Sequence, residues 1–341
     1  MKTSNKRELM RKPLFVMLFL LTSFVAYAQS PDPNFHIYLA SGGPNMEGQG
    51  PTENQDRVQP ERFFVLWSAN DCTINNVGER KKGEWYPAVP PLAHNEGAQL
   101  SVVDYFGRTL ENYLNPQIRI GIIVVAVAGA SIQLFDKDNY ASYIQTHNNY
   151  EWMTRRINAY GGNPYGRLIE MAKKAQKVGV IKGIIMHQGE ADADDSNWPS
   201  KVKSVYDNIM IDLDQRTPIP LLAGEVLRCG ICSRANKNIA KLPQKSNNFY
   251  VVSSEGYNQA LNDGQNIHFT SQEYRDFGKR YADKMIEVLG NALNPVASIS
   301  TGISSQPTVI NDNRIYNLNG QQVKSMEKGI YITNGRKVIM K

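Results

Sequence analysis

Residues 35–50 read FHIYLASGGPNMEGQG, an apolar run that passes into small residues. Residues 35–40 are mostly aliphatic or aromatic, and such side chains favour a buried β-strand. From Ser41 onward the chain is small and ends its strand pattern at Gly42-Gly43-Pro44. The pattern therefore predicts a buried strand that runs into a tight turn.

Outward from this strand, similar apolar runs alternate with amphipathic segments. Further strands are predicted at 61–67, 119–127, 178–186, 219–226 and 249–253, and helices at 99–114, 164–175, 198–213 and 270–289. Thr270 and Glu273 have the spacing of a capping box at the start of the last helix. Residues 68–96 and 130–162 are predicted to be irregular.

Continuous apolar strands that alternate with helices are typical of a parallel sheet covered on both faces. We therefore expect an α/β fold, a three-layer α/β/α sandwich with a parallel sheet. In such sheets ligands bind at the carboxyl ends of the strands. Residues that follow Ala40, Val127, Met186 and Ser253 are thus the candidates for a site.

The two ends of the chain have a different character from this core. Residues 1–28 hold five basic residues, an apolar run over 14–25 and the small-x-small pattern at 26–28. This predicts a cleaved signal peptide, hence a secreted, periplasmic or cell-surface protein. The apolar run is too short to favour a membrane anchor, and no later segment is predicted to span a membrane.

The expected boundaries are a signal peptide at 1–28, a main domain at 29–290, a Pro/Ser/Thr-rich linker at 291–308 and a β-rich appendage at 309–341. Asn319-Gly320 and Asn334-Gly335 are hairpin signals within the appendage. It resembles the C-terminal sorting tails of secreted Bacteroidetes proteins. That resemblance implies a contact with secretion machinery, and it is compatible with an appendage that packs on the main domain.

Charge and cysteine content exclude some classes of function. The formal net charge is +6, but residues 1–28 and 300–341 each carry +4, so residues 29–299 carry −2. A nucleic-acid-binding domain would concentrate basic charge, so this class is rejected. Cys229 and Cys232 have redox-motif spacing without the strand-to-helix context, and either a structural bridge or two free thiols is expected. No metal site and no cofactor are predicted.

Several blocks, in order, resemble the SGNH hydrolases, in particular the sialate O-acetylesterase and acetylxylan esterase group (carbohydrate esterase family six). The blocks are Asn45-Met46-Glu47-Gly48, residues 105–110, Gly129, residues 187–190 (His-Gln-Gly-Glu) and His268-Phe269 with the helix after it. The resemblance covers residues 35–290. It implies removal of acetyl groups from a polysaccharide or sialic acid by serine-type acyl transfer.

By this resemblance, His268 is the catalytic base, and Gly129, Gln188 and Asn45 serve the oxyanion or the substrate. The acid that orients the base stays open. The family spacing places an Asp three residues before the His, but Gln265 stands there and the nearest carboxylate is Asp263. Asp263, Glu190 or no acid at all are the alternatives.

The chain departs from the family pattern at the position of the nucleophile. The family block reads Gly-Gln-Ser-Asn-Met-x-Gly, and Pro44 occupies the position of its Ser. Proline has neither a hydroxyl nor a backbone N–H, so two functions are lost together. Ser41 is the alternative nucleophile, although the family has an apolar residue there.

Three hypotheses follow from these residues. The first is a secreted esterase that acts on acetylated carbohydrate, with its nucleophile at Ser41 or impaired by Pro44. The second is an inactive pseudoesterase that binds acetylated glycans. The third is a structural surface protein with an inert core.

Overall fold

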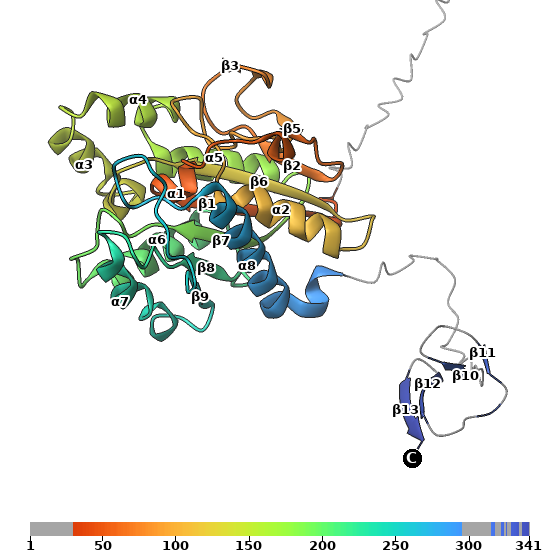
Figure 1. Cartoon of the computed structure of the whole chain (residues 1–341). Helices are drawn as coiled ribbons and strands as arrows, with labels where there is room; N and C mark the ends of the chain where they lie inside the picture. The colour runs from red at the N-terminus through yellow and green to blue at the C-terminus, as the bar shows by residue number, and fades with distance from the viewer. Residues whose placement is uncertain are drawn as a thin grey trace, which may run out of the picture. The chain divides into compact units, whose positions relative to one another are not determined.

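The computed structural model describes residues 30–294 together with residues 315–317, 322–323, 325, 329–333 and 336–340 of the appendage (Figure 1). The predicted signal peptide and most of the predicted linker lie outside these residues. The described chain forms two units, which divide after Pro295.

A seven-stranded sheet forms the centre of the first unit, in the order β5-β2-β6-β1-β7-β8-β9. All neighbours are parallel except β5, which is antiparallel to β2. The fold is therefore the predicted α/β sandwich, with one antiparallel edge strand. The strands are β1 (Phe35–Gly42), β2 (Phe63–Leu66), β5 (Trp85–Pro87), β6 (Arg119–Ala126), β7 (Val180–His187), β8 (Leu221–Gly224) and β9 (Phe249–Val252).

Helices cover both faces of this sheet (Figure 1). The helices α2 (Val102–Tyr113) and α8 (Ser271–Leu289) pack against one face, where Phe106 and Phe277 join a single apolar cluster. On the other face α5 (Pro164–Ala175) and α6 (Trp198–Asp212) contribute Leu168 and Val202 to a second cluster. Burial on both faces explains why every residue of β1 is buried.

β1 is the middle strand, and its position determines where a site can form. The chain leaves β1 for β2 on one side and later passes from β6 across β1 to β7. Crevices at the carboxyl ends of strands open where such connections diverge. The turn after β1 and the loops after β6 and β7 therefore meet at one edge of the sheet.

The two segments predicted to be irregular contain short elements. Residues 68–96 include β5 and a hairpin of β3 (Cys72–Ile74) and β4 (Gly78–Arg80). Residues 130–162 contain α3 (Tyr140–Thr146) and α4 (Glu151–Ala159). Their helical pattern is weak because α4 buries only Met153 and Ile157.

The last helix begins as the sequence predicts. The Thr270 hydroxyl accepts the Glu273 N–H, and the Glu273 carboxylate accepts the Thr270 N–H, so the capping box is complete. A short 3₁₀ helix, η5 (Gly290–Leu293), follows and buries Leu293 in the core. The folded unit thus runs three residues into the predicted linker.

In the second unit, β10 (Ile315–Asn317), β11 (Gln322–Val323), β12 (Gly329–Thr333) and β13 (Arg336–Met340) pair antiparallel in the order β11-β10-β12-β13. This is the β-rich character expected of the appendage. Over the described ranges of both units, none of the helices combines the length and apolarity needed to cross a membrane.

Candidate functional site

A cavity of about 320 Å³ lies among the loops at the carboxyl ends of β1 and β6. Four segments supply its walls: the turn after β1, the loop after β6, the helix α4 and the loop before α8. The lining residues are Pro44, Gln49, Ala128, Gly129, Trp152, Arg156, Gln265, Ile267 and His268. Two sequence-predicted site residues, His268 and Gly129, therefore share this cavity with Pro44.

The turn after β1 is stabilised by its proline. Pro44 begins the short helix α1 (Pro44–Glu47), where a missing N–H costs nothing because the first helical N–H groups have no intrahelical partner. The preceding Gly43 N–H donates to the His187 carbonyl at 2.9 Å and fixes the turn against β7. Pro44 thus suits the backbone well, but it presents no nucleophilic atom to the cavity.

Asn45 links the first and last sequence blocks. Its side chain is fully buried and donates to Glu190 Oε1 at 2.6 Å and to the Ile267 carbonyl at 3.0 Å. Its Oδ1 accepts from the Tyr274 hydroxyl at 2.6 Å and from the Phe269 N–H at 3.4 Å. Asn45 is therefore fully engaged in holding the loop before α8, and it does not line the cavity.

His268 is paired with Asp263. Its Nδ1 contacts Asp263 Oδ2, while its Nε2 is buried and has no hydrogen-bond partner among the described residues. Burial raises the pKa of Asp263, but the hydrogen bonds from His268 and from the Gln265 N–H, with the charge interaction of His268, together lower it below its ordinary value. Of the two carboxylates that the sequence leaves open, Asp263 is the one that contacts His268, and Nε2 is left facing the cavity lining.

Asp263 reaches His268 across a longer loop than the family spacing implies. Gly264 at φ +78° and Asn266 at φ +56° adopt the left-handed conformation, which turns the chain back on itself. The Leu261 N–H donates to the His268 carbonyl at 2.8 Å and closes the loop. The two extra residues are therefore absorbed in a turn.

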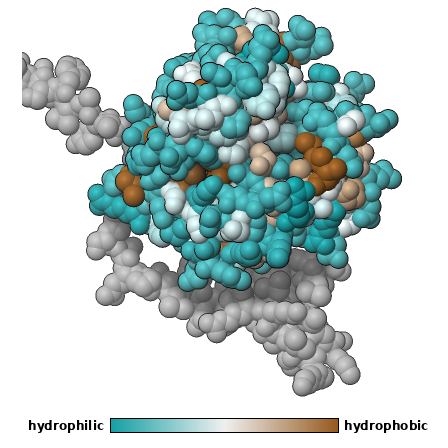
Figure 2. Space-filling model, turned by 90° about the vertical axis from the view of Figure 1, so that its left-hand side faces the viewer, coloured by the Kyte–Doolittle hydropathy of each residue, from teal (hydrophilic) through white to brown (hydrophobic). Residues whose placement is uncertain are grey.

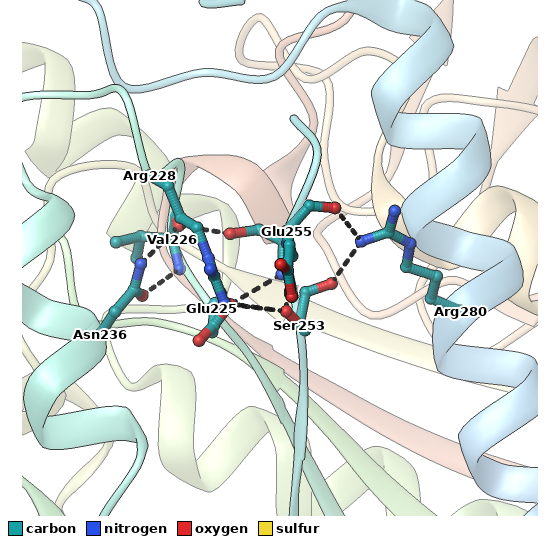
Figure 3. Close-up of polar contacts among 8 residues, drawn as sticks. Glu225, Val226, Arg228, Asn236, Ser253, Glu255 and Arg280 are labelled. Carbon is teal, nitrogen blue, oxygen red and sulfur yellow. Dashed lines mark hydrogen bonds and ion pairs between the residues drawn. The ribbon is translucent and has the colours of Figure 1, made fainter. Parts of the chain in front are cut away.

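A polar cluster at the ends of β8 and β9 holds the start of this loop (Figure 3). Glu225 accepts from Arg228 at 2.8 Å and from the Ser253 hydroxyl at 3.0 Å. Arg280 of α8 donates to the carbonyls of Ser253 and Glu255, both at 2.8 Å. These bonds tie residues 253–255, just after β9, to α8 and so fix the start of the segment that leads to Asp263 and His268.

Glu190 contacts Asn45 instead of His268. Burial raises the pKa of Glu190 to about 7, and Asp192 adds to this shift. Its Oε1 lies 4.0 Å from Nε2 of His187, and burial lowers the pKa of His187 to about 3. Glu190 therefore belongs to the support beneath the turn after β1.

Gln188 does not line the cavity. Its amide nitrogen donates to the Ala130 carbonyl at 3.2 Å and to Asp192 Oδ2, and its oxygen accepts from the Trp198 indole N–H. Both amide hydrogens are thus engaged on protein acceptors. In this conformation the side chain holds the loop after β6 in place and has no hydrogen left for an oxyanion.

Gly129 presents a free donor to the cavity. Its φ of +71° is the left-handed conformation, and its N–H makes no hydrogen bond to any residue of the described chain. A Cβ at this position would lie 2.5 Å from the Trp152 ring, so only glycine fits. This N–H is available to a carbonyl or oxyanion of a ligand.

Glu47 is a buried carboxylate that sequence reasoning missed. It lies 3.0 Å from His94 Nε2 and 3.0 Å from Arg156 Nε, and it accepts the Ala128 N–H at 2.7 Å. Burial raises the pKa of Glu47, but His94 and Arg156 outweigh this effect and lower it. Glu47 thus fixes the loop of Gly129 and the helix α4. A single acidic residue between Met46 and Gly48, in a block that is otherwise uncharged, is the only signal.

Ser41 lies inside β1, level with Val125 and Met186 in the neighbouring strands, and is 6% exposed. Alternation along the strand places its side chain on the same face as Leu39, which packs in the cluster below α5 and α6. Ser41 does not line the cavity with His268. All three cysteines, which lie within residues 30–294, are free thiols.

The comparisons with known proteins agree with this arrangement. Residues 34–287 match the family model described as carbohydrate esterase, sialic acid-specific acetylesterase. The match spans most of the chain, and the protein therefore belongs to this family of carbohydrate esterases.

Two solved structures share the fold. A protein from Arabidopsis thaliana is similar at 17% sequence identity and a TM-score of 0.57. The matched region covers 75% of this chain and 99% of the Arabidopsis chain. A protein named NanS is similar at 14% identity and a TM-score of 0.55, covering 76% of this chain and 98% of its own. At these identities the likeness establishes the fold.

Proposed function

We propose that this protein binds acetylated carbohydrate in the cavity beside His268 and does not hydrolyse it by the serine mechanism of its family. The signal-peptide pattern at 1–28 supports action outside the cytoplasm, and the appendage supports passage through secretion machinery. Family membership supports the acetylated carbohydrate as ligand.

One observation carries this proposal. No residue that lines the cavity, among the residues the structure describes, has a hydroxyl or thiol. Pro44 stands at the family's nucleophile position, and Ser41 lies on another face of the sheet. Acyl transfer to the protein needs such an atom next to the base, and loss of a nucleophile commonly reduces the rate about a millionfold.

The remaining groups suit binding. The Gly129 N–H can donate to the acetyl carbonyl, and the unpartnered Nε2 of His268 can accept from a sugar hydroxyl. A hydrogen bond between a ligand and this nitrogen would contribute about 1 kcal/mol to binding. The cavity is thus arranged to recognise a carbonyl beside a hydroxyl.

A second candidate function is hydrolysis by water, favoured by the intact His268–Asp263 pair. A water oxygen would bond to the acetyl carbon while Nε2 takes its proton. The ester C–O bond would then break, and the proton would pass from Nε2 to the leaving sugar oxygen. The products are acetate and the free sugar.

The experiment measures binding and acetate release together. Mature protein is titrated by calorimetry with acetylated xylo-oligosaccharides and with the same oligosaccharides after chemical deacetylation. We expect binding that depends on the acetyl group and no acetate released above the blank. His268→Ala is expected to weaken binding about tenfold, the value of one hydrogen bond to the ligand.

Two outcomes would overturn the proposal. Acetate release that His268→Ala abolishes would establish the hydrolytic function instead. Equal affinity for the acetylated and the deacetylated sugars would show that the protein does not recognise the acetyl group.

A further inference from the structure

We infer that the ligand is an uncharged acetylated glycan chain, and that the sugar next to the acetylated residue stacks on an aromatic platform formed by Tyr150 and Trp152. This inference rests on the proposed function and names its ligand class. It depends on three features: exposed rings, their continuity with the cavity, and the absence of a free cation there.

The platform consists of two exposed rings. Trp152 is 40% exposed and Tyr150 46% exposed, with ring centroids 6.2 Å apart and planes inclined by 48°. His147 lies 6.0 Å behind Tyr150 and stacks on Tyr143 at 4.0 Å. Tyr150 is therefore backed by further rings, which limits its movement.

The platform is continuous with the cavity. Trp152 itself lines the cavity, and its ring lies against Gly129, whose N–H is the proposed donor to the acetyl group. Arg156 lies over the same Trp152 ring at 5.6 Å and is fixed by Glu47. A ligand held by Gly129 would therefore lie next to Trp152, with Tyr150 beside that ring.

Sugars suit such rings. One face of a pyranose presents C–H groups, which carry a small positive charge, and an aromatic face is negative. Two neighbouring rings together offer a broad apolar surface, on which the sugar next to the acetylated residue can rest. The surface on the side of α3 and α4 is otherwise mostly hydrophilic, with hydrophobic atoms in a few small patches (Figure 2). This favours a polar polymer over a lipid.

The charges that line the cavity favour a neutral glycan over sialic acid. Arg156 is the only cation that lines the cavity in the described structure, and its Nε donates to both carboxylate oxygens of Glu47 at 3.0 and 3.2 Å. Its Nη1 donates to the Trp152 carbonyl at 3.0 Å. The positive charge of Arg156 is thereby balanced by Glu47, so a sialic acid carboxylate would gain less from it than from an unpaired cation and would still lose its hydration. The amides of Gln49 and Gln265 suit hydroxyl groups instead.

The test compares ligand lengths and platform variants. Wild type, Tyr150→Ala and Trp152→Ala are titrated by calorimetry with acetylated xylose, an acetylated xylo-oligosaccharide and 9-O-acetyl sialic acid. Tyr113→Ala, which removes a 60% exposed aromatic ring on α2, is the matched control. Thermal unfolding of each variant checks that it folds, and Tyr150→Ala remains informative if Trp152→Ala does not.

We expect the oligosaccharide to bind more tightly than the monosaccharide, and Tyr150→Ala to reduce oligosaccharide affinity about tenfold without affecting the monosaccharide. Tyr113→Ala should bind as wild type does. Two outcomes would overturn this inference: unchanged oligosaccharide affinity in Tyr150→Ala, or tighter binding of 9-O-acetyl sialic acid than of the oligosaccharide. Neither outcome would contradict the proposed acetyl-dependent binding. If no acetylated sugar binds at all, the proposed function fails as well.

Discussion

The turn after β1 and the loop before α8 face the same cavity, but they treat their side chains differently. In the turn, Pro44 starts α1 without losing a hydrogen bond, and Asn45 and Glu47 have all their polar atoms engaged. In the loop, His268 is oriented by Asp263 and yet leaves Nε2 buried and unpartnered. The turn directs its polar side chains into the fold, whereas the loop leaves one ring nitrogen at the cavity without a partner among the described residues.

The comparison shows which part of the site keeps groups available to a ligand. His268 holds Nδ1 against Asp263 and keeps Nε2 at the cavity, where a ligand can reach it. Pro44 is explained by stability alone. This contrast is what the proposed binding function rests on: His268 and Gly129 line the cavity, and Pro44 brings no hydroxyl to it.

Pro44→Ser gives the largest expected effect, because it restores the missing atom between His268 and Gly129. Hydrolysis of p-nitrophenyl acetate should rise by about a thousandfold or more over the parent, given that nucleophile loss costs on the order of a millionfold in a complete triad. The double variant Pro44→Ser with His268→Ala should return to the parent rate. An inactive Pro44→Ser protein that folds would show that the recognition half lacks catalytic geometry.

Glu190→Gln tests the support beneath the turn after β1 through the pH dependence of the free energy of unfolding. The folded pKa of Glu190, about 7, lies above its ordinary value of 4.5 because of burial. The stability contribution of protonated Glu190 is therefore full below pH 4.5 and lost as pH rises through 7, a loss of about 3 kcal/mol. Gln cannot ionise, so its advantage over the parent should grow from near zero at pH 4.5 to about 3 kcal/mol at pH 8.

Urea unfolding of both proteins from pH 4.5 to 8 measures this difference. Asp104, whose pKa burial also raises to about 7, titrates equally in both and cancels. Glu79→Gln, on an exposed side chain beside Lys81, is the matched control and should show a constant difference. A constant difference for Glu190→Gln too would mean that Glu190 is solvated when charged.

The sequence predicts the fold well because the fold depends on local patterns. Continuous apolar runs identify β1, β6 and β7, and the capping box identifies the start of α8. Only β5 differs from the parallel pattern, since a three-residue strand leaves too short a run to detect. The helix α4 is also hard to predict, because it buries few side chains and its apolar periodicity is therefore weak.

The site is less predictable because it depends on long-range geometry. The sequence leaves Asp263 and Glu190 as alternatives, and the positive φ values of Gly264 and Asn266 bring Asp263 to His268. No local pattern reveals that the Gln188 amide bonds Ala130 and Asp192. The contact of Glu47 with Arg156 joins residues far apart in the chain, so periodicity cannot predict it.

Ser41→Ala should have the smallest effect, and it tests the comparison most directly. Ser41 makes no side-chain hydrogen bond to the rest of the described chain and lies in β1 away from the cavity, so its hydroxyl has no partner to lose. The free energy of unfolding should change by less than about 0.5 kcal/mol. In the Pro44→Ser background the esterase rate should stay the same, because the new hydroxyl and His268 suffice. A loss of activity in that double variant would instead make Ser41 part of the site, and the turn after β1 would then hold a relocated nucleophile.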